Sequence, residues 1–239
     1  MEKRDLRLSG ATVATGGEYR DVKVSGASKI TSDITCEDMS ISGAITVDGN
    51  VKAVSCRVSG ACKINGNVKS DEIRISGGSS IKGNLEGKEI TLSGGIKVGG
   101  SIKTNLLKLA GEINVGGDME CEEFRLTGGI RSQGTVNCEK CELNLSERSE
   151  LDELVGTSII VREDTGQIGG LLKAILGKGK GSLKVNLVEG DEIHLENTDC
   201  DMVRGDTVTI GPGCRIRTVE YSTKLEIHPD ARVDEKIER

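Results

Sequence analysis

The sequence predicts an all-β protein folded as a parallel β-helix, a solenoid with about 17 residues per coil that an irregular insert interrupts. A short apolar-x-apolar motif that closes on glycine recurs at a spacing of 16 once and then of 17 six times. Apolar and polar residues alternate within each unit, as in a strand with one buried face. The chain has 33 glycines, no Trp and one Phe, which indicates a narrow aliphatic core.

Each repeat unit predicts three short strands separated by corners. After the motif the unit continues with a second and a third apolar stretch, and glycine or polar residues stand between them, where the chain can turn. A helical interpretation fails because the apolar residues do not follow a spacing of about 3.6. The glycines that close the motif are Gly10, Gly26, Gly43, Gly60, Gly77, Gly94, Gly111 and Gly128.

Stacking the units brings equivalent residues into columns, as in other solenoids. The polar positions beside the first column, such as Lys23 and Arg57, should face solvent, with Ser40, Arg74, Thr91, Lys108 and Arg125. The first inward column is Leu8, Val24, Ile41, Val58, Ile75, Leu92, Leu109, Leu126 and Leu143. The second is Ile30, Val47, Ile64, Ile81, Val98 and Val115, and the third is Ile34, Val51, Val68, Leu85, Ile102, Met119 and Val136. A fourth column is glycine: Gly49, Gly66, Gly83, Gly100, Gly117 and Gly134.

The repeat stops after Leu145, so we expect a first array over 1–145, an irregular basic insert over 146–181 and a second, shorter array over 182–239. In the second array Ile193, Ile210 and Ile227 are 17 residues apart, and Val208 and Leu225 keep the same register. The sequence leaves open whether the two arrays stack.

The insert contains apolar residues at the spacing of one helical face, followed by lysines. Two interpretations stay open: a short surface helix that contacts a membrane or a partner, or a flexible loop that packs onto the solenoid or caps its end. The residues concerned are Ile168, Leu171, Leu172, Lys173, Ile175, Leu176, Lys178 and Lys180.

Chemistry-bearing residues are few, and we expect no catalytic, cofactor or metal site and no enzyme. His194 and His228 should lie on outward strand faces without a partner for catalysis. Cys138 and Cys141 form a C-x-x-C without a second ligand pair, so they should fill the core rather than bind zinc. The run Ile210–Ile216 is similar to one turn of an acyltransferase β-helix, but the period is 17 and no histidine stands there.

The formal net charge is −6 with both signs interleaved, and the stacking platforms of a nucleic-acid binder are missing. We therefore expect neither a nucleic acid nor a small-molecule substrate as a partner. No secretory signal and no apolar run long enough to span a bilayer stand out, which predicts a cytoplasmic protein with reduced cysteines, and peripheral membrane contact as a further option.

The glycine-marked coils, together with the runs Val188–Ile193 and Val208–Cys214, resemble the bactofilin family of bacterial polymer-forming cytoskeletal proteins. The resemblance implies a right-handed β-helix that assembles end to end into filaments without nucleotide. It also implies a scaffold that acts in cell shape or positions other proteins, with further copies or a paralogue as partners. Some members of the family contact the membrane.

The ends of a solenoid expose unpaired strand edges and an open core, so end-to-end stacking is a natural way to bury them. We expect Leu6, Leu8, Ile227 and Val233 at these joints. The charged run Asp234–Arg239 could instead block growth at the C-terminal end. The alternative function is a non-polymerising β-helical binding module that presents one face to a protein or membrane partner.

Overall fold

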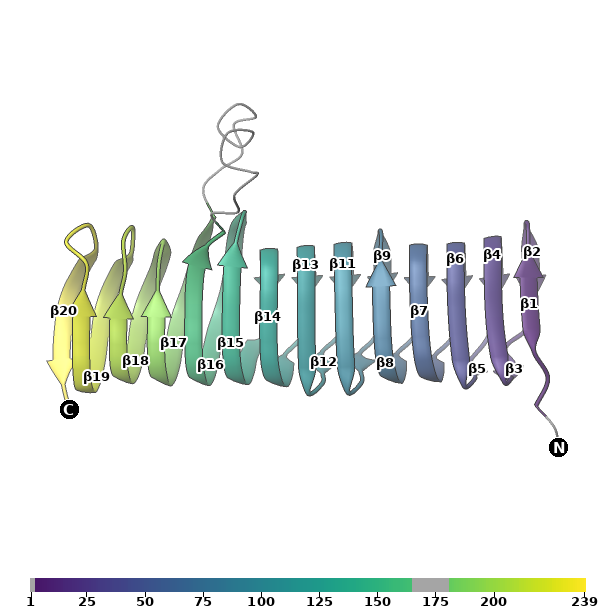
Figure 1. Ribbon diagram of the computed structural model, residues 1–239, viewed down its shortest axis with the longest axis horizontal. Coiled ribbons are helices and arrows are strands. Elements are labelled where there is room, and N and C mark those ends of the chain that lie inside the picture. Colours follow the sequence, from purple (N-terminus) through teal and green to yellow (C-terminus); the bar gives the residue numbers. More distant parts are fainter. Residues whose placement is uncertain (1–2, 165–180) are drawn as a thin grey trace, which may run out of the picture. The chain divides into compact units, whose positions relative to one another are not determined.

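The computed structural model describes residues 3–164 and 181–239, and these residues form strands and short connections without a helix (Figure 1). Every ladder between the strands is parallel. The predicted all-β parallel solenoid is therefore confirmed. The chain divides into two compact units, Met1–Gly117 and Asp118–Arg239.

The first unit repeats one long strand and one or two short strands per coil, each paired with its equivalent in the next coil (Figure 1). Leu6 pairs with Val22 at an offset of 16, and Val22 pairs with Met39 at an offset of 17. The strands are β1 (Leu6–Ser9), β2 (Thr12–Ala14), β3 (Gly17–Glu18), β4 (Asp21–Ile30), β5 (Ile34–Thr35), β6 (Asp38–Val47), β7 (Val51–Ile64), β8 (Val68–Ser76), β9 (Ser79–Ile81), β10 (Leu85–Glu86), β11 (Glu89–Val98), β12 (Ile102–Lys103) and β13 (Leu106–Val115).

The three predicted apolar columns are buried. Their members in the first unit are at most 8% exposed, and Leu8 in the first coil is the most exposed of them. A further apolar column, which the sequence reasoning did not set out, lies two residues before the first column and is at most 1% exposed. It consists of Val22, Met39, Cys56, Ile73, Ile90 and Leu107. Aliphatic burial of this density is the main favourable term in the folding of the unit.

The glycine that closes each motif is required by both backbone and space. Gly60 has a φ of 133°, which side chains rarely adopt, and a Cβ there would lie 2.2 Å from the carbonyl oxygen of Gly43. The same contact recurs one coil later, where a Cβ on Gly77 would lie 2.3 Å from the Gly60 oxygen. The period of the glycines is therefore the period of the coil.

The predicted glycine column at the second corner lies against a ladder of Asx side chains. Asp33 Oδ1 accepts a hydrogen bond from the Asn50 backbone N–H at 2.7 Å, and Asn50 Oδ1 accepts one from Asn67 N–H at 2.8 Å. Position 83 in the next coil must be glycine, because a Cβ on Gly83 would lie 2.2 Å from Asn67 Oδ1. At the start of the ladder, donation from the Asn50 backbone and side chain lowers the pKa of Asp33.

The second unit has longer strands and a variable coil length. Cys121 pairs with Cys138 at an offset of 17, whereas Cys141 pairs with Ile159 at 18. Phe124 is fully buried. The strands are β14 (Met119–Ser132), β15 (Thr135–Leu145), β16 (Arg148–Glu163), β17 (Ser182–Leu195), β18 (Thr198–Ile210), β19 (Arg215–Ile227) and β20 (Arg232–Glu238).

One predicted register in this unit is wrong. Ile193 pairs with Val208, at an offset of 15, and not with Ile210. The coil is shorter because its corner is a tight turn at Asn197, which has a φ of 48° and whose N–H donates to the Pro212 carbonyl. The predicted pair of Ile210 with Ile227 is present.

The structure describes a regular strand in part of the predicted irregular insert. β16 covers Arg148–Glu163 and pairs with β15 on one side and β17 on the other. Its Arg148 to Ser182 pairing spans an offset of 34, twice the usual period, so the chain between them returns to the same ladder. The rest of the insert, residues 165–180, lies outside the described residues, and the three-part division of the chain stays a prediction.

Candidate assembly ends and surface faces

At the N-terminal end of the first unit, the first coil leaves a strand edge open. β1 and β2 both pair with β4, and no other described strand pairs with them. Of the two predicted joint residues, Leu6 is half-buried and Leu8 is 8% exposed. Another chain could therefore contact the unpaired backbone groups of this edge and the half-buried Leu6 side chain. The Leu8 side chain already belongs to the core.

A tyrosine covers the part of the first coil where the core column is empty. Gly17 stands in the third column, beside Ile34, and has no side chain to fill it. The Tyr19 ring lies 3.7 Å from where a Gly17 Cβ would be, and Tyr19 is 5% exposed. Its hydroxyl donates to the Thr15 carbonyl at 3.4 Å, and the Arg4 guanidinium lies 5.7 Å from the ring centroid.

The sequence alone does not predict this cap. Tyr19 is one of only two tyrosines in the chain, and that rarity was the one available signal.

At the C-terminal end of the second unit, the third column ends in a charge. Val188, Val203 and Val219 occupy this column with 0% exposure. The next residue in register is Lys236, which is exposed. Its neighbour Glu235 pairs with the buried Thr218 and accepts a hydrogen bond from its hydroxyl at 3.2 Å.

The predicted joint residues Ile227 and Val233 lie in this last coil and are half-buried. The structure thus places Leu6 and Leu8 in the first coil, and Ile227 and Val233 in the last. It does not test whether they form joints.

Ion pairs tie the last coils together on their outer side. Arg204 contacts Glu189 and Glu220, each at 2.9 Å, and Arg239 contacts Glu220 at 2.6 Å. The hydrogen bond from Arg204, followed by the charges of Arg239 and Arg204, lowers the pKa of Glu220. The Tyr221 hydroxyl bonds Glu238 at 3.3 Å. This end is held by charged and polar groups.

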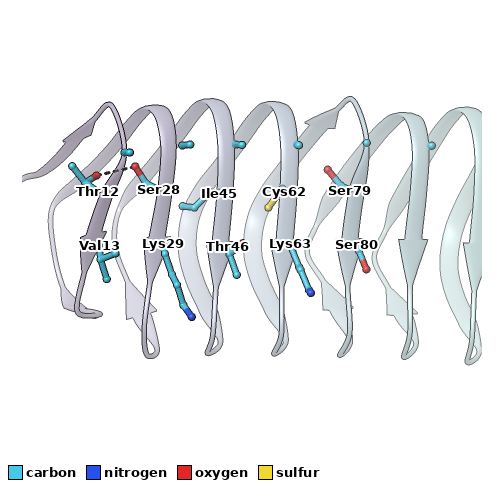
Figure 2. Close-up of a pocket in the computed structure, with 16 residues that line it drawn as sticks. Thr12, Val13, Ser28, Lys29, Ile45, Thr46, Cys62, Lys63, Ser79 and Ser80 are labelled. Carbon is cyan, nitrogen blue, oxygen red and sulfur yellow. Dashed lines mark hydrogen bonds between the residues drawn. The ribbon is translucent and has the colours of Figure 1, made fainter.

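A shallow groove of about 730 Å³ runs over the first six coils of the first unit (Figure 2). Small residues line one side of it: Ala11, Ala27, Ala44, Ala61, Gly78 and Gly95. A row of outward side chains lines the other: Val13, Lys29, Thr46, Lys63 and Ser80, which Figure 2 shows pointing to the same side. The repeat pattern alone does not predict this groove.

Among the described residues, no three His, Cys, Asp or Glu residues gather as a candidate metal site. His194 lies 3.2 Å from Glu196, and His228 lies 3.7 Å from Asp230, both on the surface.

All eight cysteines are buried and free. Burial raises the pKa of Cys36 to about 11 and that of Cys56 to about 12, so these thiols stay protonated. Cys121 and Cys138, adjacent in the ladder, also have raised pKa values; a hydrogen bond between the two thiols is the largest cause for Cys121.

The eight residues predicted to contact a membrane or a partner, Ile168 to Lys180, lie outside the described residues. In the described parts of the chain, no helix is long and apolar enough to cross a membrane.

Comparison with known proteins decides the family of the N-terminal region. Residues 2–86 match the family model described as "Bactofilin: Polymer-forming cytoskeletal". The chain carries a bactofilin region. It covers β1 to β10, which include the open edge, the Tyr19 cap and five of the six coils along the groove. The resemblance found in the sequence is confirmed over these residues.

Two proteins of Bacillus subtilis (strain 168) are similar to the chain. Identity to "Uncharacterized protein YhbF" is 39% over 88 residues, which is 37% of this chain and 34% of YhbF. Identity to "Uncharacterized protein YhbE" is 50% over 52 residues, 22% of each chain. The chain therefore spans about a third or less of the length of these curated relatives. No solved structure matches it.

Proposed function

We propose that this bactofilin-type chain is a structural scaffold that assembles end to end into filaments without nucleotide, organising cell shape or positioning partner proteins. The match of residues 2–86 to a polymer-forming family carries the proposal. The open edge of β1 and β2 lies in that same region and supports it, because an unpaired parallel strand is a template for another chain.

A second copy of the chain is the expected partner, and a paralogue with the same coil could replace it. A parallel ladder accepts any edge with the same strand spacing, so the backbone alone does not discriminate between the two. We propose that the protein works in the cytoplasm. The buried thiols fit a reducing compartment, since none of them is used in a disulfide.

The test is electron microscopy and sedimentation velocity of the purified chain without nucleotide, over a range of protein concentrations. We expect elongated assemblies that grow with concentration. Leu6→Lys should shorten or dissolve them, because the new charge would have to be buried at the joint. Val54→Lys is the matched control, since Val54 is 56% exposed in the middle of the first unit. Compact monomers under every condition would contradict the proposal.

One observation favours the second candidate function, a binding module that does not polymerise. Lys236 in the core column makes the last coil unfavourable to bury. If the chain stays monomeric while a partner binds one of its faces, Leu6→Lys should leave that binding intact. The same variant therefore separates the two functions.

The insert supports a further proposal, contact with a membrane. Leu171 and Leu172 stand among lysines in the sequence, a composition suited to the interface of anionic lipids. Leu171→Asp/Leu172→Asp should lower co-sedimentation with vesicles of phosphatidylglycerol if the insert makes this contact. Unchanged binding would remove the insert from the proposal.

A further inference from the structure

Two of the eight buried cysteines, Cys121 and Cys138, face each other across a strand ladder. They are in register where β14 pairs with β15, one coil apart. In the ladders that the structure describes, no other two cysteines are in register. Cys56, for example, lies between Met39 and Ile73 in its ladder. Regular stacking therefore brings one specific pair of thiols together in the second unit.

The separation of this pair suits a covalent bond. Neighbouring strands of a ladder are about 4.8 Å apart, which lies within the roughly 4.4–6.8 Å between the Cα atoms of a disulfide. A hydrogen bond already joins the two thiols. In the next coil Cys138 is in register with Gly156, which has no side chain. The sulfur of Cys121 is therefore the in-register side-chain neighbour of Cys138, and a small side-chain rotation would join them.

The two thiols differ in their access to solvent. Cys121 is 9% exposed, more than any of the other seven cysteines, whereas Cys138 is 2% exposed. A small oxidant that enters from solvent therefore meets Cys121 first. Cys138 lies behind it in the core, where it can react with an oxidised Cys121 but is shielded from larger reagents.

We propose that Cys121 and Cys138 are an oxidation site, at which a peroxide joins them in a disulfide that links β14 to β15. The Cys121 thiol takes one oxygen from hydrogen peroxide, becomes a sulfenic acid and releases one water. The Cys138 sulfur then attacks the sulfenic sulfur, and its proton leaves with the hydroxyl group as a second water. Two thiols lose two electrons and two protons, and the peroxide is reduced to two waters.

The surroundings make this oxidation slow and reversible. The hydrogen bond with Cys138, followed by burial, raises the pKa of Cys121, so the reactive thiolate is scarce at neutral pH and increases as the pH rises. The ladder holds the strands slightly wider than a relaxed disulfide prefers between its Cβ atoms, about 3.5–4.5 Å. Such a bond is readily reduced by a dithiol. The thiols therefore rest in the reduced form and are linked under sustained oxidation.

A third thiol, Cys141, competes for Cys138. The two form a hydrogen bond on the same strand, and this bond together with burial outweighs the opposite effect of Cys121, so the pKa of Cys138 is raised overall. Cys141 is in register with Phe124 and Ile159 and is 2% exposed, so a peroxide reaches it less easily than Cys121. Access and register together favour the link between coils.

The test treats the purified full chain with hydrogen peroxide at mildly alkaline pH, blocks the remaining thiols after denaturation and maps the linked peptides by mass spectrometry. We expect a Cys121–Cys138 link within one chain, with the other six thiols blocked. Because the link closes a loop in the unfolded chain, the thermal midpoint should rise by about 5 °C or more. Dithiothreitol should reverse both changes.

Cys121→Ala should abolish the link and the rise of the midpoint. Cys56→Ala removes a cysteine with 0% exposure outside the pair and is the matched control, which should keep both. A main product that joins Cys138 to Cys141, links two chains, or stops at a sulfinic acid on Cys121 would overturn the proposal. Peptide mapping of the wild-type chain decides this even where a variant fails to fold. Neither readout depends on end-to-end assembly, because both cysteines belong to one copy.

Discussion

The first coil of the first unit and the last coil of the second unit carry different residues at the equivalent core position. In the first coil the position is Gly17, and the Tyr19 ring fills the space it leaves. In the last coil the position is Lys236, exposed beside Glu235. An aromatic cover keeps an end apolar, whereas a lysine keeps its charge only while water reaches it. We infer that a single residue at a core position decides whether the terminal coil of a solenoid can stack on another coil or is kept exposed to solvent by its charge.

The largest expected effect comes from moving that lysine into the interior of the column. Val203→Lys places a charge at a position with 0% exposure, two coils before Lys236. The cost of burying an unpaired ammonium is several kcal/mol, about 4 or more, which should unfold the second unit. Thermal unfolding followed by circular dichroism measures it. Thr209→Lys, on an outward position of the same strand, is the control and should change the midpoint little.

A wild-type-like midpoint for Val203→Lys would mean that the column tolerates charge. The charge of Lys236 would then not be what prevents another coil from stacking on the last one.

The second effect tests the aromatic cover of the first coil. Tyr19→Ala removes a ring that is 5% exposed and leaves Gly17 uncovered, which should cost about 3 kcal/mol in the free energy of unfolding. The loss should be local, so amide hydrogen exchange should speed up in β1 to β3 before the later coils. Tyr221→Ala, which removes a half-buried ring from the last coils, is the comparison. Uniform acceleration over the whole first unit would show that Tyr19 is not an end cover.

The parts of the fold that the sequence predicted are those set by a strict period. Because strands pair in register, the columns through Val24 and Ile30 follow from counting 17 residues. The Asx ladder was missed because Asn50 and Asn67 are 17 residues apart and look like ordinary corner residues until the coils stack. The coil from Ile193 to Val208 was missed because a corner can shorten without disturbing the ladders on either side.

The strand β16 is a whole element that the sequence did not predict. Its inward positions include Ser149, Leu151 and Leu154, all at most 3% exposed, while Glu150 and Asp152 face solvent. The alternation was present, but acidic residues and a buried serine masked it. Of the candidate site, the positions of the end residues could be predicted. Tyr19 and the groove of the first unit could not, since both depend on which residues neighbouring coils bring together.

The third effect tests whether the last coil becomes apolar, like the first coil, when its lysine is replaced. Lys236→Val restores the residue that the column carries at Val188, Val203 and Val219, so the last coil would expose an apolar core position. Burying that side chain against another copy stabilises association by about 1.4 kcal/mol or more, a tenfold change in affinity. Sedimentation velocity should show larger species than wild type at equal concentration. Lys224→Val, which also removes an exposed lysine near the last edge but outside the column, should not.

If Lys224→Val enlarges the assemblies as much as Lys236→Val, removal of charge and not the core column controls growth.

The smallest expected effect is the response of the last coils to acid. Arg204 and Arg239 lower the pKa of Glu220 below its ordinary value of about 4.3. A carboxyl whose pKa is lowered in the folded state stabilises that state above its unfolded pKa, and the contribution is lost as the pH falls through the lowered value. Hydrogen exchange of β19 and β20 should therefore quicken below about pH 4 relative to β1. Glu220→Gln should show quick exchange at neutral pH and little further change on acidification. An equal response of the first and last coils would show that the ion pairs do not distinguish the two ends.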